Sequence, residues 1–185
     1  QYCTAQYGHH WGMAASTAGA RKTQRVTFDH NTVRYVDELP GGQNGHCIKF
    51  AANNNTDGGT HAVVSNSTIH DCNYAGIQFS NGWAYGEFFG NRIYNYGLRG
   101  SGQGEGARCG SSGSQEAGCS VHDNDIGGGP NGTGSSIGTS IYIQEDARNV
   151  RVFNNKLHDN DWHGIYVFAV GNSYPSDTRI FNNVI

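Results

Sequence analysis

Apolar positions along the chain recur in short runs of four or five residues, and Gly or Asn separates most of these runs. No stretch of about twelve residues keeps the 3.6-residue apolar period of an amphipathic helix. Short runs rich in Ile, Val and Phe and bounded by turn formers are typical of β-strands. The pattern therefore predicts a nearly all-β chain.

One apolar position recurs six times and serves as an anchor for aligning the chain with itself. The anchor is occupied by Val33, Ile69, Ile93, Ile126, Leu157 and Ile185. Two positions earlier, five of the six copies have Asn and the other has Ser67. Five positions before the anchor, the residue is always apolar: Phe28, Val64, Phe88, Val121, Val152 and Ile180. These positions predict one recurring strand followed by an Asn turn.

A second strand recurs downstream of the anchor, after a loop of variable length. Its copies are "CIKF" at 47–50, "GIQF" at 76–79, "SIYI" at 140–143 and "GIYV" at 164–167, with a weaker copy, "GARC", at 106–109. The anchors are 24 to 36 residues apart. This variation is expected when coils of one kind carry loops of different length at one corner.

A single coil cannot bury its apolar positions, whereas coils stacked at about 4.8 Å form parallel sheets around a narrow core. We therefore predict an all-β, right-handed parallel β-helix of about six coils over residues 25–185, preceded by an irregular cap or partial rung at residues 1–24. The recurring Asn side chains are expected to form a hydrogen-bonded ladder. A β-sandwich or antiparallel barrel is the alternative, and it predicts two-residue hairpins without a common anchor.

Two segments carry a resemblance to a known superfamily, "SNSTIHDCNYAGIQF" at 65–79 and "FNNKLHDNDWHGIYV" at 153–167. They resemble the coil repeats of right-handed parallel β-helix proteins, which include pectate and alginate lyases, polygalacturonase-like hydrolases, mannuronan epimerases and phage tailspikes. The resemblance covers residues 25–185. It implies the fold but selects no activity, because coil repeats reflect stacking rather than chemistry. The chain matches neither a pectate-lyase calcium constellation nor the Asp-Pro-His signature of alginate epimerases.

Charge and hydropathy exclude some partners. The net charge is −3 and the basic residues are scattered, so a nucleic-acid partner is not expected. No apolar run approaches the roughly 18 residues that a membrane span needs. Five cysteines and three Asn-x-Ser/Thr glycosylation candidates, Asn54, Asn66 and Asn131, favour a secreted, extracellular protein.

The cysteines also predict a disulfide. Cys109 and Cys119 close a short Gly/Ser-rich loop, and we predict that they pair. Cys47 and Cys72 lie 14 and 3 residues after their anchors, which places them at different corners and argues against a bridge between them. The pairing of Cys3, Cys47 and Cys72 stays open.

Candidate site residues follow from the alternation of side chains along the second strand. The residue after each inward apolar position is expected to face solvent, and the resulting row is Lys49, Gln78, Arg108, Tyr142 and Tyr166. Cations and aromatic rings in one line suit a polysaccharide that bears carboxylates. The alternative is an ordinary solvated sheet face.

Other candidates lie outside this row. Arg151 and Arg179 are expected on adjacent rungs, where a bound anion would relieve their repulsion. His158 precedes Asp159, a pair suited to general-base catalysis, although similar pairs at His70 and His122 indicate that it belongs to the repeat. No ligand set for a metal is evident, and calcium is a possibility without a recognisable site.

The leading hypothesis is a secreted carbohydrate-active protein, a polysaccharide lyase or glycoside hydrolase that binds a polysaccharide or surface glycan on an exposed sheet. In the lyase version, Arg108 or Lys49 neutralises the uronate carboxylate, and Tyr142, Tyr166 or His158 acts as base. Gln78, Arg151 and Arg179 would bind substrate. The alternative is a non-catalytic extracellular fibre or adhesin. Because "RIFNNVI" at 179–185 begins a coil, we also expect a continuing chain or self-assembly through an open terminal rung.

Overall fold

The computed structural model describes residues 3–6, 8, 10–17, 24–37, 45–52, 59–80, 82–99, 104–110, 117–130, 138–169 and 171–185. Within these ranges the chain forms 18 β-strands and no helix. All of the strand pairs are parallel, and they build three sheets of six strands each. The prediction of an all-β parallel β-helix of about six coils is therefore confirmed.

Each sheet takes every third strand of the chain. Sheet I contains β1 (Cys3–Gln6), β4 (Asn31–Val36), β7 (Thr68–Cys72), β10 (Arg92–Tyr96), β13 (Asp125–Gly129) and β16 (Lys156–Asn160). Sheet II contains β2 (Trp11–Thr17), β5 (His46–Ala52), β8 (Ile77–Phe79), β11 (Glu105–Cys109), β14 (Thr139–Gln144) and β17 (Ile165–Phe168). Sheet III contains β3 (Gln24–Asp29), β6 (Thr60–Ser65), β9 (Ala84–Phe89), β12 (Ala117–His122), β15 (Arg151–Phe153) and β18 (Arg179–Phe181).

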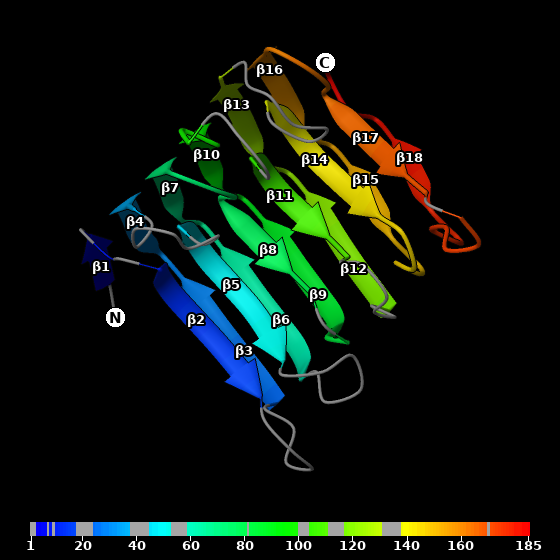
Figure 1. Cartoon of the computed structure of the whole chain (residues 1–185), viewed down its shortest axis with the longest axis horizontal. Helices are drawn as coiled ribbons and strands as arrows, with labels where there is room; N and C mark the ends of the chain where they lie inside the picture. The colour runs from blue at the N-terminus through cyan, green and yellow to red at the C-terminus, as the bar shows by residue number, and fades with distance from the viewer. Residues whose placement is uncertain are drawn as a thin grey trace.

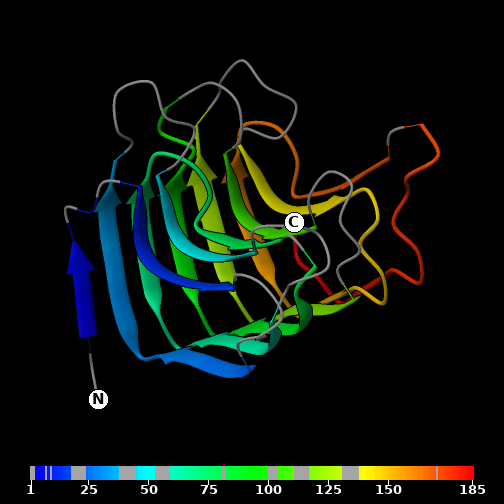
Figure 2. The same ribbon diagram turned by 60° about the horizontal axis from the view of Figure 1, so that its bottom comes forward.

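The chain visits the sheets in the order I, II, III and then returns to sheet I one rung further along. Figure 1 shows the rungs stacked from the blue N-terminal strands to the red C-terminal ones, with sheet II facing the viewer. In the tilted view of Figure 2, the chain passes around a narrow interior. The two ends of the chain lie at opposite ends of the stack.

Each coil has three strands, one more than the repeat predicted. The unit interpreted as one strand and a turn is two strands, such as β6 and β7, which meet at a corner. The residue before each ladder position has a left-handed backbone there: Asn66, Asp123, Asn154 and Asn182 have φ between 47° and 55°. Asn and Asp tolerate this conformation, so the turn residues bend the chain sharply between sheets III and I.

The Asn ladder is confirmed at that corner. The backbone N–H groups of Asn91, Asn124 and Asn155 donate to the Oδ1 atoms of Asn124, Asn155 and Asn183 at 3.0–3.1 Å. The side-chain Nδ2 of Asn91 also donates to Asn124 Oδ1 at 3.0 Å. Ser67 takes part in the same column, because its Oγ accepts from Asn31 N at 3.0 Å. The ladder satisfies buried backbone donors at successive rungs.

The anchors form one row inside sheet I and the apolar positions before the Asn turn form another inside sheet III. Val33 aligns with Ile69, Ile69 with Ile93, and the row continues through Ile126 and Leu157. In the sheet III row, Val64, Phe88, Val121 and Val152 are fully buried. Side chains of sheet II, including Phe50 and Phe79, complete the core. Stacking therefore places one kind of residue at each position of every rung.

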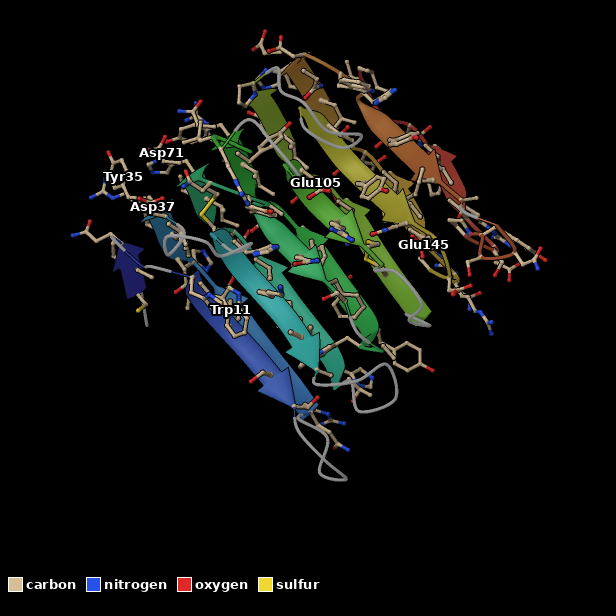
Figure 3. All side chains as sticks on the ribbon, viewed as in Figure 1. Trp11, Tyr35, Asp37, Asp71, Glu105 and Glu145 are labelled. Atoms are coloured by element: carbon tan, nitrogen blue, oxygen red, sulfur yellow. A yellow bond between two sulfur atoms is a disulfide. The ribbon has the colours of Figure 1, made fainter. Side chains whose placement is uncertain are left out.

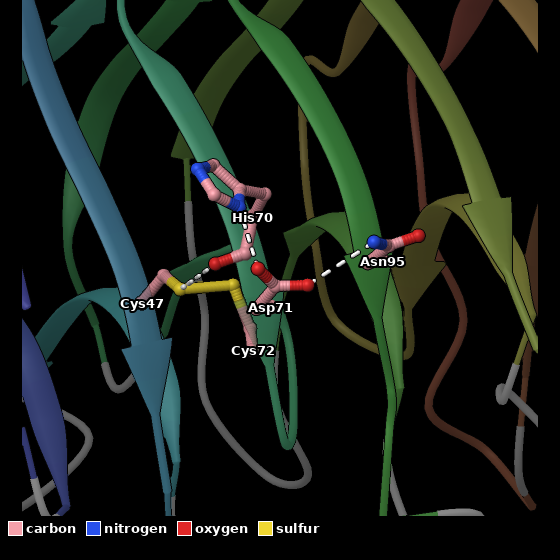
Figure 4. The surroundings of a disulfide bond; sticks show 5 residues. All are labelled: Cys47, His70, Asp71, Cys72 and Asn95. Carbon is pink, nitrogen blue, oxygen red and sulfur yellow. Dashed lines mark hydrogen bonds and ion pairs between the residues drawn. A yellow bond between two sulfur atoms is a disulfide. The ribbon is translucent and has the colours of Figure 1, made fainter. Parts of the chain in front are cut away.

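Two disulfides close corners of the coil. Cys109 bonds to Cys119, which confirms the predicted pair. Cys47 bonds to Cys72 with 5.5 Å between the Cα atoms, so the argument against this bridge is wrong (Figure 4). The reason is that the count from the anchor included the loop between sheets I and II. Cys72 ends a strand of sheet I and Cys47 lies near the start of one in sheet II, at the same corner. Cys3 is free and exposed.

Among the described residues before Gln24, two strands belong to the stack. β1 pairs with β4 in sheet I, and β2 pairs with β5 in sheet II. None of the described residues forms a helix long and apolar enough to cross a membrane.

Candidate functional site

The outer face of sheet II holds the predicted row. Lys49 aligns with Gln78, Gln78 with Arg108, Arg108 with Tyr142, and Tyr142 with Tyr166. The residues therefore occupy consecutive rungs, spaced by about 4.8 Å. The register between strands aligns these residues, and the alternation of side chains along each strand puts them on the same face.

The row is far less exposed than predicted. Gln78, Arg108 and Tyr142 keep 4%, 2% and 3% of their surface accessible, and Lys49 and Tyr166 are half-buried. One cause is that the side chains cover one another. The Arg108 guanidinium lies 5.5 Å from the centre of the Tyr142 ring, which stacks in turn on Tyr166 at 5.5 Å. Alternation gives the direction of a side chain, whereas its exposure depends on what packs over it.

Arg108 is the centre of a polar network. Its Nε donates to Gly110 O at 3.0 Å, and its Nη2 donates to Gln144 Oε1. Its Nη1 lies 3.8 Å from Glu105 Oε1, beyond hydrogen-bond distance, and makes no hydrogen bond to any described residue. Arg108 Nη1 is therefore within ion-pair range of the buried Glu105 carboxylate but makes no hydrogen bond in the described part of the chain.

A second outward row lies three residues before the first one along each strand. It contains His46, Glu105 and Thr139. The pairing of Ile48 with Ile77, and of Ile77 with Ala107, puts His46 and Glu105 in one column with Ala75 between them. His46 keeps 1% of its surface exposed, and neither of its nitrogens has a hydrogen-bond partner within the described ranges. Figure 3 shows Trp11 and Glu105 over the same face, with Glu145 at the end of β14.

Sequence reasoning missed His46 and Glu105. The signal was present, because His46 precedes Lys49 by three residues and Glu105 precedes Arg108 by three. Aligning the copies of the second strand three residues further upstream would have found them.

Burial shifts the pKa values of three groups in this cluster. It lowers the pKa of Lys49 to about 8, with a further contribution from the positive charge of Arg108. It lowers the pKa of His46 well below 6.5, so that this imidazole is neutral at neutral pH. It raises the pKa of Tyr142, whose phenol therefore keeps its proton. In each case desolvation disfavours the charged form.

The remaining predicted residues lie on other faces. His158 belongs to β16 in sheet I, where its Nδ1 lies 2.7 Å from Asp159 Oδ2 and its Nε2 lies 2.8 Å from Asp125 Oδ1. These carboxylates raise its pKa, Asp159 most strongly. Arg151 and Arg179 are neighbours in sheet III. His158 therefore lies on a different sheet from Lys49 and Arg108, and its role as a base stays a prediction.

Other candidate positions fall outside the cluster or outside the described residues. Asn66 is exposed at a corner, where its Nδ2 donates to Asp29 Oδ1 at 3.0 Å. Asn54 and Asn131 lie outside the described residues. In the described part of the chain, no three His, Cys, Asp or Glu side chains are grouped as they would be around a metal ion.

Comparison with known proteins matches residues 15–185 to the sequence family described as "Right handed beta helix region". A comparison with curated proteins found no match. Among solved structures, an alginate lyase from Paenibacillus sp. str. FPU-7 is 18% identical with a TM-score of 0.60, over 95% of this chain and 53% of the lyase.

Two further structures have the same coil stack. The enzymatically active domain of bacteriophage CBA120 tailspike protein 2 is 15% identical with a TM-score of 0.59, over 97% of this chain and 23% of the tailspike chain. XylC, solved in complex with xylose, is 14% identical with a TM-score of 0.57, over 85% of this chain and 26% of XylC. This chain therefore spans a quarter to a half of the length of these proteins, and at such identities the likeness establishes the fold alone.

Proposed function

The chain belongs to the right-handed β-helix family, and on this premise we propose that it binds an acidic polysaccharide on the outer face of sheet II and cleaves it by β-elimination. The alginate lyase and the tailspike domain are named as enzymes, and XylC was solved with a sugar. These names support a carbohydrate ligand. The choice of an acidic polymer comes from the residues of this chain.

The observation that carries the proposal is that Arg108 Nη1 makes no hydrogen bond within the described residues, although it lies in ion-pair range of Glu105. A buried donor without a partner costs about 1–3 kcal/mol, a cost that a ligand carboxylate would remove. Gln78 Oε1 and both nitrogens of His46 lack hydrogen-bond partners among the described residues as well. Together they offer a carboxylate-binding cation with neighbouring groups for sugar hydroxyls.

Lys49 is the candidate base. With a pKa of about 8 it holds an appreciable neutral fraction near neutral pH, which proton abstraction requires. Its Nζ takes the proton from the carbon next to the uronate carboxylate, and the electron pair forms a carbon–carbon double bond as the adjacent glycosidic C–O bond breaks. The leaving oxygen takes a proton from the Tyr142 phenol. This assigns Tyr142 as an acid, whereas the sequence suggested a base, because burial raises its pKa.

The two disulfides favour an oxidising location, and we propose that the protein is exported. A second candidate is a non-catalytic glycan-binding rod, because Tyr142, the proposed acid, keeps only 3% of its surface exposed. In that case Arg108 holds a carboxylate and Lys49 removes no proton.

The test is incubation with pectin, alginate and glycosaminoglycans, following unsaturated product by ultraviolet absorbance. We expect product from a uronate polymer, at a rate that rises with pH and levels off above about pH 8 as Lys49 loses its proton. Lys49→Met should lower the rate by about 100-fold or more. Lys156→Met, at an exposed position on sheet I, is the matched control and should leave it unchanged.

If the protein binds a polymer but forms neither unsaturated product nor new reducing ends, the proposal of cleavage is rejected and the non-catalytic glycan-binding rod remains. Absence of both product and binding for every polymer would contradict the whole proposal.

A further inference from the structure

The outer face of sheet III carries a hollow of about 470 Å³ that lies apart from the row on sheet II. It spans β6, β9, β12 and β15. The hollow exists because β12 has two small residues, Gly118 and Ser120, where its neighbours have large ones. Glu87 aligns with Ser120 and Ser120 with Arg151, so the walls stand two rungs apart, roughly 10 Å.

One wall is an open aromatic ring. Tyr85 is 59% exposed and stacks on His61, in the rung before it, with 5.2 Å between ring centres. By the same register, the next residue in its column is Gly118, whose missing side chain lets the ring lean over it: a Cβ there would lie 2.9 Å from Tyr85 Cδ1. The exposed part of the Tyr85 ring lines the hollow.

The other wall is cationic. Arg151 is exposed and aligns with Arg179 on the next rung, so two cationic side chains start about one strand spacing apart. Their repulsion favours an anion at this edge of the hollow. On the Tyr85 side, the Glu87 carboxylate lies 3.1 Å from His122 Nε2, which fixes an acceptor beside the ring.

The floor is held in place by covalent structure. Cys119 lies between Gly118 and Ser120, is 1% exposed, and forms the disulfide with Cys109. Gly118 N also donates to Arg148 O at 2.8 Å. A floor fixed at this position lowers the ordering cost of binding.

We propose that this hollow is a second saccharide site, which binds one uronate residue between Tyr85 and Arg151. The apolar face of the sugar ring packs on Tyr85, its carboxylate pairs with Arg151, and its hydroxyls bond to Glu87 and Ser120. The site uses no residue of the row on sheet II. It therefore stands or falls independently of cleavage there.

The experiment measures binding of methyl β-glucuronide to the full chain by ligand-observed NMR, with methyl β-glucoside as the neutral match. The glucuronide should bind about two- to fivefold more tightly, because its carboxylate adds an ion pair with the exposed Arg151. Arg151→Gln should remove that difference. Tyr85→Ala should weaken both sugars, and Ser120→Phe should abolish binding by filling the hollow.

Matched controls lie on sheet I. Tyr35→Ala removes another exposed tyrosine with positive φ, and Arg92→Gln removes another exposed arginine. Both should leave glucuronide binding unchanged, and circular dichroism checks that each variant folds. No glucuronide binding by the native chain would overturn the proposal. So would binding that survives both Arg151→Gln and Ser120→Phe.

Discussion

Single residues at the corners determine where the coil turns. Each ladder Asn does two things, because its Oδ1 accepts a backbone N–H from the previous rung while its Nδ2 donates to a backbone carbonyl. Asn124 illustrates this: its Nδ2 donates to Phe88 O at 2.9 Å, and its Oδ1 accepts from Asn91 N at 3.0 Å. At 3% exposure, water cannot replace these bonds.

We therefore expect Asn124→Ala to lower the free energy of unfolding by about 2–4 kcal/mol, since buried backbone groups lose their partners. Asn124→Ser should lose less, because Ser67 shows that an Oγ can accept the backbone donor in this column. Urea denaturation of both variants measures the difference. Equal losses for Ser and Ala would show that the hydrogen bonds of the ladder contribute little.

At the scale of an element, sheet II carries charge that the fold disfavours. The pKa of Lys49 falls from 10.5 to about 8 on folding, chiefly through burial. The unfolded chain therefore binds this proton more tightly than the folded one. As pH falls from above 10.5 toward 8, this group progressively destabilises the protein, and below pH 8 the penalty is complete.

Lys49→Met is expected to raise the free energy of unfolding at pH 7 by about 1–3 kcal/mol. This range is reduced for the partial exposure of Lys49 and for the loss of its contact with Trp11, whose ring centre lies 5.4 Å from Lys49 Nζ. Stability gained with activity lost is the signature of a residue kept for function. Denaturation at pH 7 and at pH 10.5 measures the difference in free energy of unfolding between the variant and the native chain. This difference should be smaller at pH 10.5. Lys156→Met should change stability by less than about 0.5 kcal/mol. A destabilised Lys49→Met at pH 7 would refute the argument.

The whole molecule is a stack whose strands pair only with those of neighbouring rungs, so covalent links across its corners matter. Cys47–Cys72 joins consecutive rungs across 25 residues, and Cys109–Cys119 closes 10 residues. Loops of this length constrain the unfolded chain by about 3 kcal/mol each.

Replacing Cys47 and Cys72 together by Ser should lower the free energy of unfolding by about 3 kcal/mol, and replacing Cys109 and Cys119 by slightly less, because that loop is shorter. Thermal and chemical denaturation compare the two double variants. Mass mapping of non-reduced peptides should find both bridges and a free Cys3. A different disulfide pairing of these cysteines would contradict the strand register at the two corners that the disulfides close.

The sequence alone determined the fold and the rows. Stacked coils repeat one environment at each position, so Ile, Val and Asn recur at intervals that can be read from the chain, as with Ile69, Ile93 and Ile126. The same regularity predicted that Lys49, Gln78 and Arg108 share a row. It also predicted the Cys109–Cys119 disulfide from its short loop.

Only the tertiary structure shows which residues of different sheets are neighbours at a corner of the coil. Cys47 and Cys72 meet because loops of different length separate strands that end at one corner, and loop length hides that proximity in a linear count. His158 is separated from Arg108 because their strands belong to different sheets. The burial of Arg108 and the gap above Gly118 depend on neighbouring rungs that are far away in sequence. Periodicity along the chain determines direction and register, whereas exposure and proximity depend on packing between coils.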